Sequence, residues 1–373
     1  MRTTILLVTV IFILFVSTGL KKLIVGRRDI SNAYFITTLG IDKENEDIML
    51  TMITKNIGSG SETEQSVKRN DFFISKGETI FQANRELHSF VDRRIFWGHL
   101  DYVIMSEELV SDGLAPYIDF FIRDHETRLL TNLYILRGSA AVELFKISTD
   151  NGVDLTKQIS VLNNSIGAVS ISGEEKMHHI YNDLTNQYCS THIPTISLTQ
   201  KENTQMIENN EEETDDSKNI KLVLDGYAFF DQETSKLLGF LDGDAARGFN
   251  FATDNVESGV IVVQDVNGDD VSLEIIGTNT VIEAKYSNSE IEVTINVTLT
   301  SNVVNISGTI DIFNDDMIND LVDQQNKVIE ENIMSSIAFS KEHNADIIEI
   351  SSVIFHGDPV YWETIKDEWR EIY

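Results

Sequence analysis

Histidine is the residue type through which this chain could most directly bind a transition metal. His178 and His179 are adjacent, and His192 follows nearby. Adjacent histidines point in different directions on any regular element, and no carboxylate–histidine spacing of a zinc motif is present. We therefore expect surface or packing histidines and no metal or cofactor site, with a histidine metal site as the alternative.

Cys189 is the only cysteine of the chain. A single thiol excludes an intrachain disulfide and every metal site that needs several cysteines. No catalytic motif surrounds it, so the sequence favours a buried structural thiol.

Acidic residues offer two further possibilities, a calcium loop and a carboxylate pair. Residues 265–270 (DVNGDD) superficially resemble a calcium loop but lack the length and the glutamate of an EF-hand, and they fall where a hairpin turn is expected. Asp242 and Asp244, with Arg247, could form a carboxylate pair for acid–base chemistry, although an isolated Asp-Gly-Asp is usually a turn. Residues 97–99 (Trp-Gly-His) are typical of core or capping positions. No glycine-flanked nucleophilic serine, P-loop or dinucleotide fingerprint occurs, so the sequence makes no case for an enzyme.

Composition limits the class of protein and of partner. The 373 residues suffice for two or three domains, and 42% hydrophobic with 24% charged residues is an ordinary globular balance. The 29 basic against 60 acidic residues give a formal net charge of −31, which opposes binding to nucleic acid or to an anionic lipid surface. Any membrane attachment must then come from a hydrophobic segment.

The N-terminus provides such a segment. Residues 3–20 are 18 uncharged residues, about the length of a membrane-spanning helix, and Ser17, Thr18 and Gly19 resemble an export-processing site. The next residue is Leu20, whose side chain cannot be acylated. The four basic residues of KKLIVGRRDI follow, and by the positive-inside tendency they favour a body on the cytoplasmic side.

Hydrophobic periodicity predicts alternating strands and helices in the first half. We expect a flexible loop at 56–70 and an α/β or α+β arrangement overall. The predicted strands are 33–42, 48–55, 100–106 and 131–137, and the predicted helices are 79–91 and 107–123, the second interrupted by Gly113 and Pro116.

The second half reads as a meander of antiparallel strands with a long amphipathic helix across one face, after an acidic linker at 201–219. Residues 291–299 alternate strictly between apolar and polar, and Asn267-Gly268 predicts a two-residue hairpin turn. We expect the long helix at 316–342, a strand at 347–355, and a last helix that begins at Asp358-Pro359. The predicted units are an anchor (1–26), an N-terminal domain (27–200), the linker, and a C-terminal domain (220–373), with a split of the last near 258 as an alternative.

Several stretches together resemble the spore germinant-receptor C-subunit family, the Ger(x)C lipoproteins. Residues 26–42 (GRRDISNAYFITTLGID) resemble its first motif, although Val25-Gly26 stand where the family has Trp-Asp. Residues 75–128 are similar to its most recognisable segment, and DGYAFF, LLGFLDGDAARGFNF, HNADIIEI and YWETIKDEW resemble later motifs. The matching positions singled out here, which we expect to determine the fold before they make contacts, are Gly40, Asp42, Gly98, His99, Asp124, Arg247 and Gly248.

The resemblance implies a non-enzymatic subunit of a nutrient sensor, held on the outer face of the spore inner membrane beside two polytopic subunits of A and B type. The nutrient pocket would lie in those partners, and this chain would support assembly or signalling. In the family the lipid cysteine falls where Leu20 stands, so we expect residues 3–20 to remain as an uncut transmembrane anchor, with cleavage at another site as the rival. Members of the family usually continue into one more charged strand after the last helix, so the resemblance leads us to expect a C-terminal sheet with an open edge or one that a partner covers. A surface-anchored binding module outside a receptor, and a degenerate paralogue, remain alternatives.

Overall fold

The computed structural model describes residues 33–55, 71–200, 220–287, 290–308 and 314–373. The predicted anchor, the loop at 56–70 and the acidic linker lie outside these residues. No helix within the described ranges is long and apolar enough to cross a membrane.

The first part of the structure is built on a mixed sheet that has nine strands among the described residues. Its middle strands, β1, β5, β6 and β7, are parallel, and antiparallel strands flank them on both sides. Every residue of β5 is buried, as expected for a parallel strand that is covered on both faces. The order is β3 (Asp71–Gly77), β2 (Asp47–Lys55), β1 (Ala33–Glu44), β5 (Tyr102–Ser106), β6 (Asn132–Arg137), β7 (Thr191–Gln200), β8 (Ile220–Phe230) and β9 (Leu237–Leu241), with β4 (Arg94–Phe96) beside β1.

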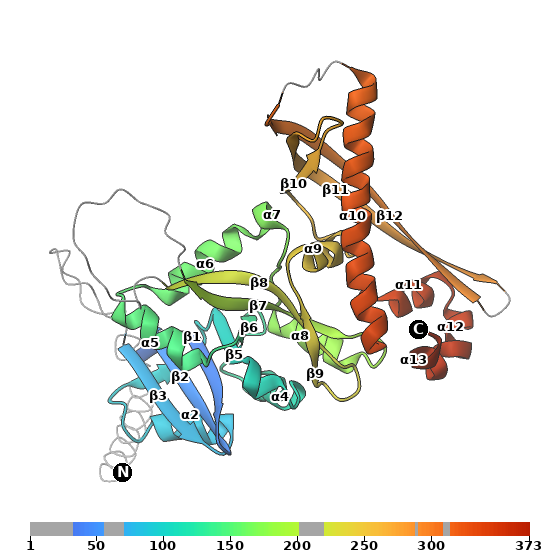
Figure 1. Cartoon of the computed structure of the whole chain (residues 1–373). Helices are drawn as coiled ribbons and strands as arrows, with labels where there is room; N and C mark the ends of the chain where they lie inside the picture. The colour runs from blue at the N-terminus through green and yellow to red at the C-terminus, as the bar shows by residue number, and fades with distance from the viewer. Residues whose placement is uncertain (1–32, 56–70, 201–219, 288–289, 309–313) are drawn as a thin grey trace, which may run out of the picture.

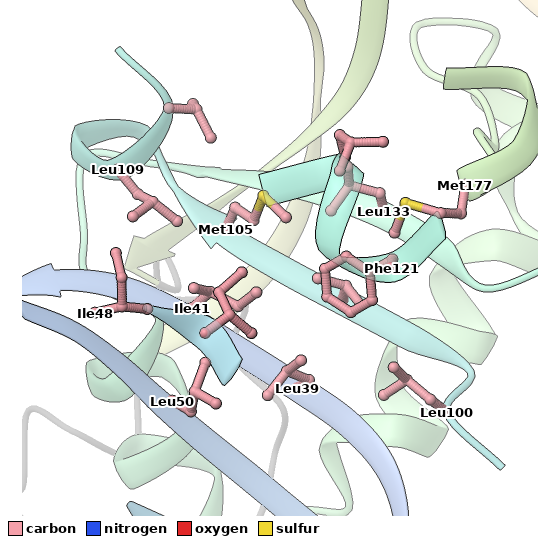
Figure 2. Close-up of a cluster of buried hydrophobic side chains, with 14 of the residues drawn as sticks. Leu39, Ile41, Ile48, Leu50, Leu100, Met105, Leu109, Phe121, Leu133 and Met177 are labelled. Atoms are coloured by element: carbon pink, nitrogen blue, oxygen red, sulfur yellow. The ribbon is translucent and has the colours of Figure 1, made fainter. Parts of the chain in front are cut away.

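Helices cover both faces of this sheet. On one face Phe121 and Met177, from two different helices, pack with strand residues such as Leu39 and Leu133 (Figure 2). On the other face Phe145 and Ile159 pack against Ile104. The first face carries α2 (Ile80–Leu87), α3 (Glu107–Val110), α4 (Ala115–Arg123) and α8 (Met177–Thr185), the second α5 (Ala141–Asp150) and α6 (Leu155–Asn164), and α7 (Ile166–Val169) follows α6.

The predicted elements of this part are largely confirmed. The first strand extends to Glu44, and the helix expected at 79–91 ends at Leu87. The helix at 107–123 is interrupted as predicted, because α3 ends before Gly113 and α4 has Pro116 in its first turn. Sequence periodicity missed β3, β7 and the helices between β6 and β7.

The second part consists of a long antiparallel sheet with a helix across it, as predicted. Within the described residues the sheet has three strands, β10 (Gly259–Gln264), β11 (Asp270–Ser287) and β12 (Glu290–Ile306), with β12 at one edge. The predicted long helix is α10 (Asp315–His343), which runs along the sheet with α9 (Gly243–Ala252) against it (Figure 1). Leu321, Ile329 and Ile333 of the predicted stripe are buried, but Val322 is exposed.

The hairpin between β10 and β11 is confirmed, but its predicted two-residue turn is wrong. The strands end at Gln264 and begin again at Asp270, so five residues connect them. Of the five connecting residues, Gly268 alone adopts a positive φ (84°), whereas a two-residue type I′ turn needs positive φ at both central residues.

The strand predicted at 347–355 is wrong, because residues 350–355 belong to the helix α11 (Ile350–Gly357) and residues 347–349 form no regular element. The Asp346 carboxylate accepts hydrogen bonds from the backbone N–H groups of Ile350 and Ser351, which caps the helix and overrides the β-branched composition. The next helix, α12 (Pro359–Ile365), begins as predicted, with the Asp358 carboxylate accepting from the N–H groups of Val360 and Tyr361. A 3₁₀ turn (Lys366–Glu368) separates it from α13 (Trp369–Ile372).

Strand pairing crosses the predicted linker. β8, at the start of the predicted C-terminal domain, pairs with β7 over ten residues of the first sheet, and β9 pairs with β8. The two sheets therefore divide the chain between β9 and β10, close to the alternative split near residue 258. The domain boundaries proposed from the sequence remain a prediction.

Candidate functional site

Gly40 and Asp42 both lie where the strand β1 contacts the helix α5, and both help to hold the two together. A Cβ atom at Gly40 would lie 2.9 Å from the Phe145 ring and 3.0 Å from Ala141 Cβ, so the absence of a side chain lets α5 approach the strand. Asp42 is 1% exposed, and its carboxylate accepts the N–H groups of Ala141 (2.6 Å) and Val142 (2.9 Å) at the start of α5. Burial raises the pKa of Asp42, and these two hydrogen bonds oppose the rise.

Gly98 and His99 lie in the turn between β4 and β5. A Cβ at Gly98 would lie 2.6 Å from the Phe96 ring, so this position is closed to larger residues unless the ring moves. The His99 ring is exposed and makes edge contacts with Phe35 (5.2 Å between centroids) and Phe96 (5.8 Å). Asp124 ends α4, where its carboxylate accepts the Glu126 N–H at 2.7 Å and shapes the following turn.

Arg247 and Gly248 lie where α9 crosses α10. A Cβ at Gly248 would lie 2.7 Å from the Ile333 nitrogen and closer still to the carbonyl of Asn332, so only glycine permits this crossing. Arg247 contacts Asp244 at 3.4 Å. The seven family-like positions thus lie at four separate places: the β1–α5 contact, the β4–β5 turn, the end of α4 and the crossing of α9 with α10. Among the described residues, no hydrogen bond or ion pair joins a family-like position at one of these places to one at another.

The carboxylates of Asp242 and Asp244 take part in separate ion pairs. Asp242 Oδ2 lies 3.2 Å from the Arg137 guanidinium, which also contacts Asp225 at 2.9 Å. The same guanidinium lies over the Phe240 ring, 4.3 Å from its centroid. Because Asp244 pairs with Arg247 instead, the acid–base pair considered from the sequence does not form around a common point.

Two of the three histidines meet at one carboxylate. His192 Nε2 lies 3.3 Å and His179 Nδ1 3.6 Å from the oxygens of Glu175. His178 instead places Nδ1 3.0 Å from the carbonyl oxygen of Leu129. Within the described ranges no group of three or more His, Cys, Asp or Glu side chains is arranged to hold a metal ion.

The pKa values of His192 in this junction and of nearby Asp183 are shifted from their ordinary values. Burial alone would lower the pKa of His192, but the hydrogen bond and charge of Glu175 raise it above its ordinary value. Burial raises the pKa of nearby Asp183 to about 6, against the attraction of His192. The His192 ring also packs edge-on against Phe249 (5.0 Å), so the His192 side of this junction packs against the protein core, whereas the His179 side chain is exposed.

Cys189 is buried, as expected. Its Sγ lies 3.0 Å from Ser351 Oγ of α11, and burial raises the pKa of the thiol to about 12. Residues 265–269 form the hairpin turn expected in this stretch, in which the Asp265 carboxylate accepts the N–H groups of Asn267 and Asp269 (both 2.8 Å).

Sequence reasoning missed the open spaces of the molecule. A groove with both apolar and polar lining follows the edge strand β12 where α10 crosses it, with neighbouring cavities of about 440 and 330 Å³. The alternation of β12 predicted one packed face, but only the position of the helix decides how much of that face stays uncovered. The lining residues of the larger cavity are Val293, Ile295, Val297, Leu299, Ile329, Ile333, Met334 and Ile337, together with the polar residues Asn326 and Glu330.

The fold defines the class of protein: an α+β protein with two separate sheets. Its family-like residues lie mainly where one helix or strand meets another. The model of the "Spore germination protein N-terminal domain" matches residues 26–198, and that of the "Spore germination B3/GerAC like, C-terminal" domain matches residues 225–373. The chain belongs to the spore germinant-receptor C-subunit family, Ger(x)C, as its motifs indicated.

Relatives of the chain include three proteins of Bacillus subtilis (strain 168). It is 20% identical to the putative spore germination protein YfkR over 354 residues, covering 93% of this chain and 88% of the relative. It is 22% identical to spore germination protein KC over 356 residues (93% and 87%) and 22% identical to spore germination protein B3 over 364 residues (93% and 88%). The crystal structure of the GerBC protein shares the fold, with a TM-score of 0.56, 19% identity, and coverage of 90% of this chain and 92% of that one.

Proposed function

We propose that this protein is a non-enzymatic, membrane-anchored subunit of a nutrient germinant receptor, needed for assembly or signalling in spore germination. The observation that carries the proposal is the family match to both halves of the chain, combined with family-like residues that stabilise junctions between elements. Asp242 and Asp244 belong to separate ion pairs, and His178 contacts a backbone carbonyl apart from the Glu175 carboxylate that His179 and His192 share.

We place the body on the outer face of the spore inner membrane, beside two polytopic subunits of A and B type. The groove between β12 and α10 is consistent with a further contact there, because it leaves aliphatic side chains of β12 only half-buried, such as Ile295 and Val297. Attachment would rest on the uncut residues 3–20, since Leu20 stands at the lipidation position of the family.

The test is a purification of the tagged full chain from detergent-solubilised spore membranes, with mass spectrometry of its partners and of its N-terminal peptide. Recovery of two polytopic proteins in roughly equal amounts, with an intact peptide that contains Met1, supports the proposal. A chain recovered alone and still in the membrane favours a free-standing envelope binding module or a degenerate paralogue.

The anchor can be tested with a matched pair of variants in the middle of the apolar run. Val10→Asp places a charge at the expected bilayer centre, where an aspartate costs about 2.5–3.5 kcal/mol, and should release the chain from the membrane fraction. Val10→Ile should leave the chain in place. Release of both variants, or a wild-type mass that lacks about twenty residues, would refute the uncut anchor.

A further inference from the structure

A cavity of about 660 Å³ opens between the β1–β2 turn, the start of α2 and the helix α4. Its volume lies within the range of about 300–1,000 Å³ that is typical of sites for small molecules. The apolar lining includes Ile48 and Ile80, which are buried, and the half-buried Tyr117 and Phe120. Phe81 adds a ring that is 52% exposed.

The rim of the cavity carries more acids than permanent cations. The four carboxylates are those of Glu46, Glu78, Asp119 and Asp124, against Lys43 and Arg123, with His125 beside them.

The two cations are already engaged by carboxylates. Arg123 Nε contacts Asp119 at 2.6 Å, and Lys43 Nζ lies 3.5 Å from Asp112. In the described part of the chain, Glu46 and Glu78 have no ion pair. The cavity therefore presents uncompensated negative charge, on a chain whose formal charge is −31.

We propose that this cavity binds a small organic cation, an ammonium group on an apolar or aromatic body. The carboxylates of Glu46 and Glu78 would receive the ammonium group, and the apolar lining would receive the body. The aromatic rings add attraction for a cation, although Arg85 already lies 5.0 Å from the centroid of the Phe81 ring. This binding activity goes beyond the proposed role in assembly and does not depend on it.

The direct test uses the detergent-solubilised full chain and two probes of the same shape but opposite charge. Phenethylamine and 3-phenylpropionate are titrated separately, and binding is followed by saturation-transfer NMR and calorimetry. We expect saturable binding of the amine, at least about tenfold tighter than binding of the carboxylate, and weaker binding at high salt. Equal binding of the two probes, or no saturable binding of the amine at millimolar concentration, would overturn the proposal.

Variants then locate the binding. Glu46→Gln and Glu78→Gln each remove one exposed charge and should weaken amine binding about two- to fivefold, the range of an exposed ion pair. The matched control is Glu283→Gln on β11, an exposed glutamate outside the cavity lining, which should leave binding unchanged. If the control weakens binding as much as the other two, the general field of the acidic chain accounts for it and the cavity does not.

Discussion

Asp42 offers the sharpest test of the idea that the family-like residues stabilise the fold. Its side chain is 1% exposed and accepts the first two N–H groups of α5. Asp42→Ala removes both acceptors and leaves two buried donors without partners, each of which costs about 1–3 kcal/mol. The positive end of the helix dipole also loses its counter-charge. We expect the free energy of unfolding to fall by about 3 kcal/mol.

Asp42→Asn should have a smaller effect. The amide oxygen can still accept the Ala141 N–H at the position of Oδ1, but the amide nitrogen would face the N–H of Val142, and two donors cannot bond. Because burial raises the pKa of Asp42, the neutral amide also avoids the desolvation of a charge. We expect a loss of about 1 kcal/mol, near the lower end for an unsatisfied buried donor.

The assay is urea unfolding of the full chain in mild detergent, followed by far-UV circular dichroism and tryptophan fluorescence. Asp150→Ala is the control, because Asp150 is exposed at the other end of the same helix, where a negative charge is not favoured. The control should match the wild type or be slightly more stable. If Asp42→Ala lost no more stability than Asp150→Ala while germination still failed, Asp42 would be a contact residue and the packing interpretation would be refuted.

Three further predictions follow from the junctions of the fold. Gly248→Ala should destabilise the protein by about 3 kcal/mol, because its Cβ would overlap the backbone of α10, whereas Gly277→Ala, with open space around its Cβ, should be tolerated in the same unfolding assay. Burial raises the pKa of Asp183 and Asp346 from 3.8 to about 6. Between about pH 4 and pH 6 the folded chain therefore binds more protons than the unfolded chain, so the free energy of unfolding should fall as the pH rises through this range. Cys189, buried and with its thiol pKa raised to about 12, should resist maleimide in the folded chain and react once urea unfolds it.

For each of these three predictions, one experimental result would contradict the reasoning. Equal stability of the two glycine variants would mean that the helix crossing tolerates a side chain. A free energy of unfolding that rises with pH in that window would mean that the two aspartates are stabilised as anions. Rapid labelling of the native thiol would place Cys189 at an accessible surface.

Local patterns predicted many of the elements. The long helix was expected at 316–342 and spans Asp315–His343, since an amphipathic pattern over several turns admits no other regular structure. The alternation of 291–299 likewise predicted β12. Patterns were insufficient at 347–355, where a run of β-branched residues predicted a strand and the capping carboxylate of Asp346 produced a helix.

The candidate sites were less predictable, because each depends on residues far apart in the chain. The sequence identified Asp42, Gly40 and Gly248 by resemblance, but nothing local indicates that the first two contact α5, about a hundred residues later, or that the third meets α10. The cavity at α2 and α4 was not anticipated at all.

By itself, the sequence determined the acidic character of the chain, its apolar N-terminal segment, the presence of most strands and helices, and membership of the family. These properties depend on composition, periodicity and short motifs, all of which are local. The tertiary structure alone decided that β8 and β9 complete the first sheet, that Glu175 meets two histidines, and where cavities remain open. Such features arise from long-range strand pairing and helix packing, whose energies belong to pairs of distant residues and therefore leave no periodic signal along the chain.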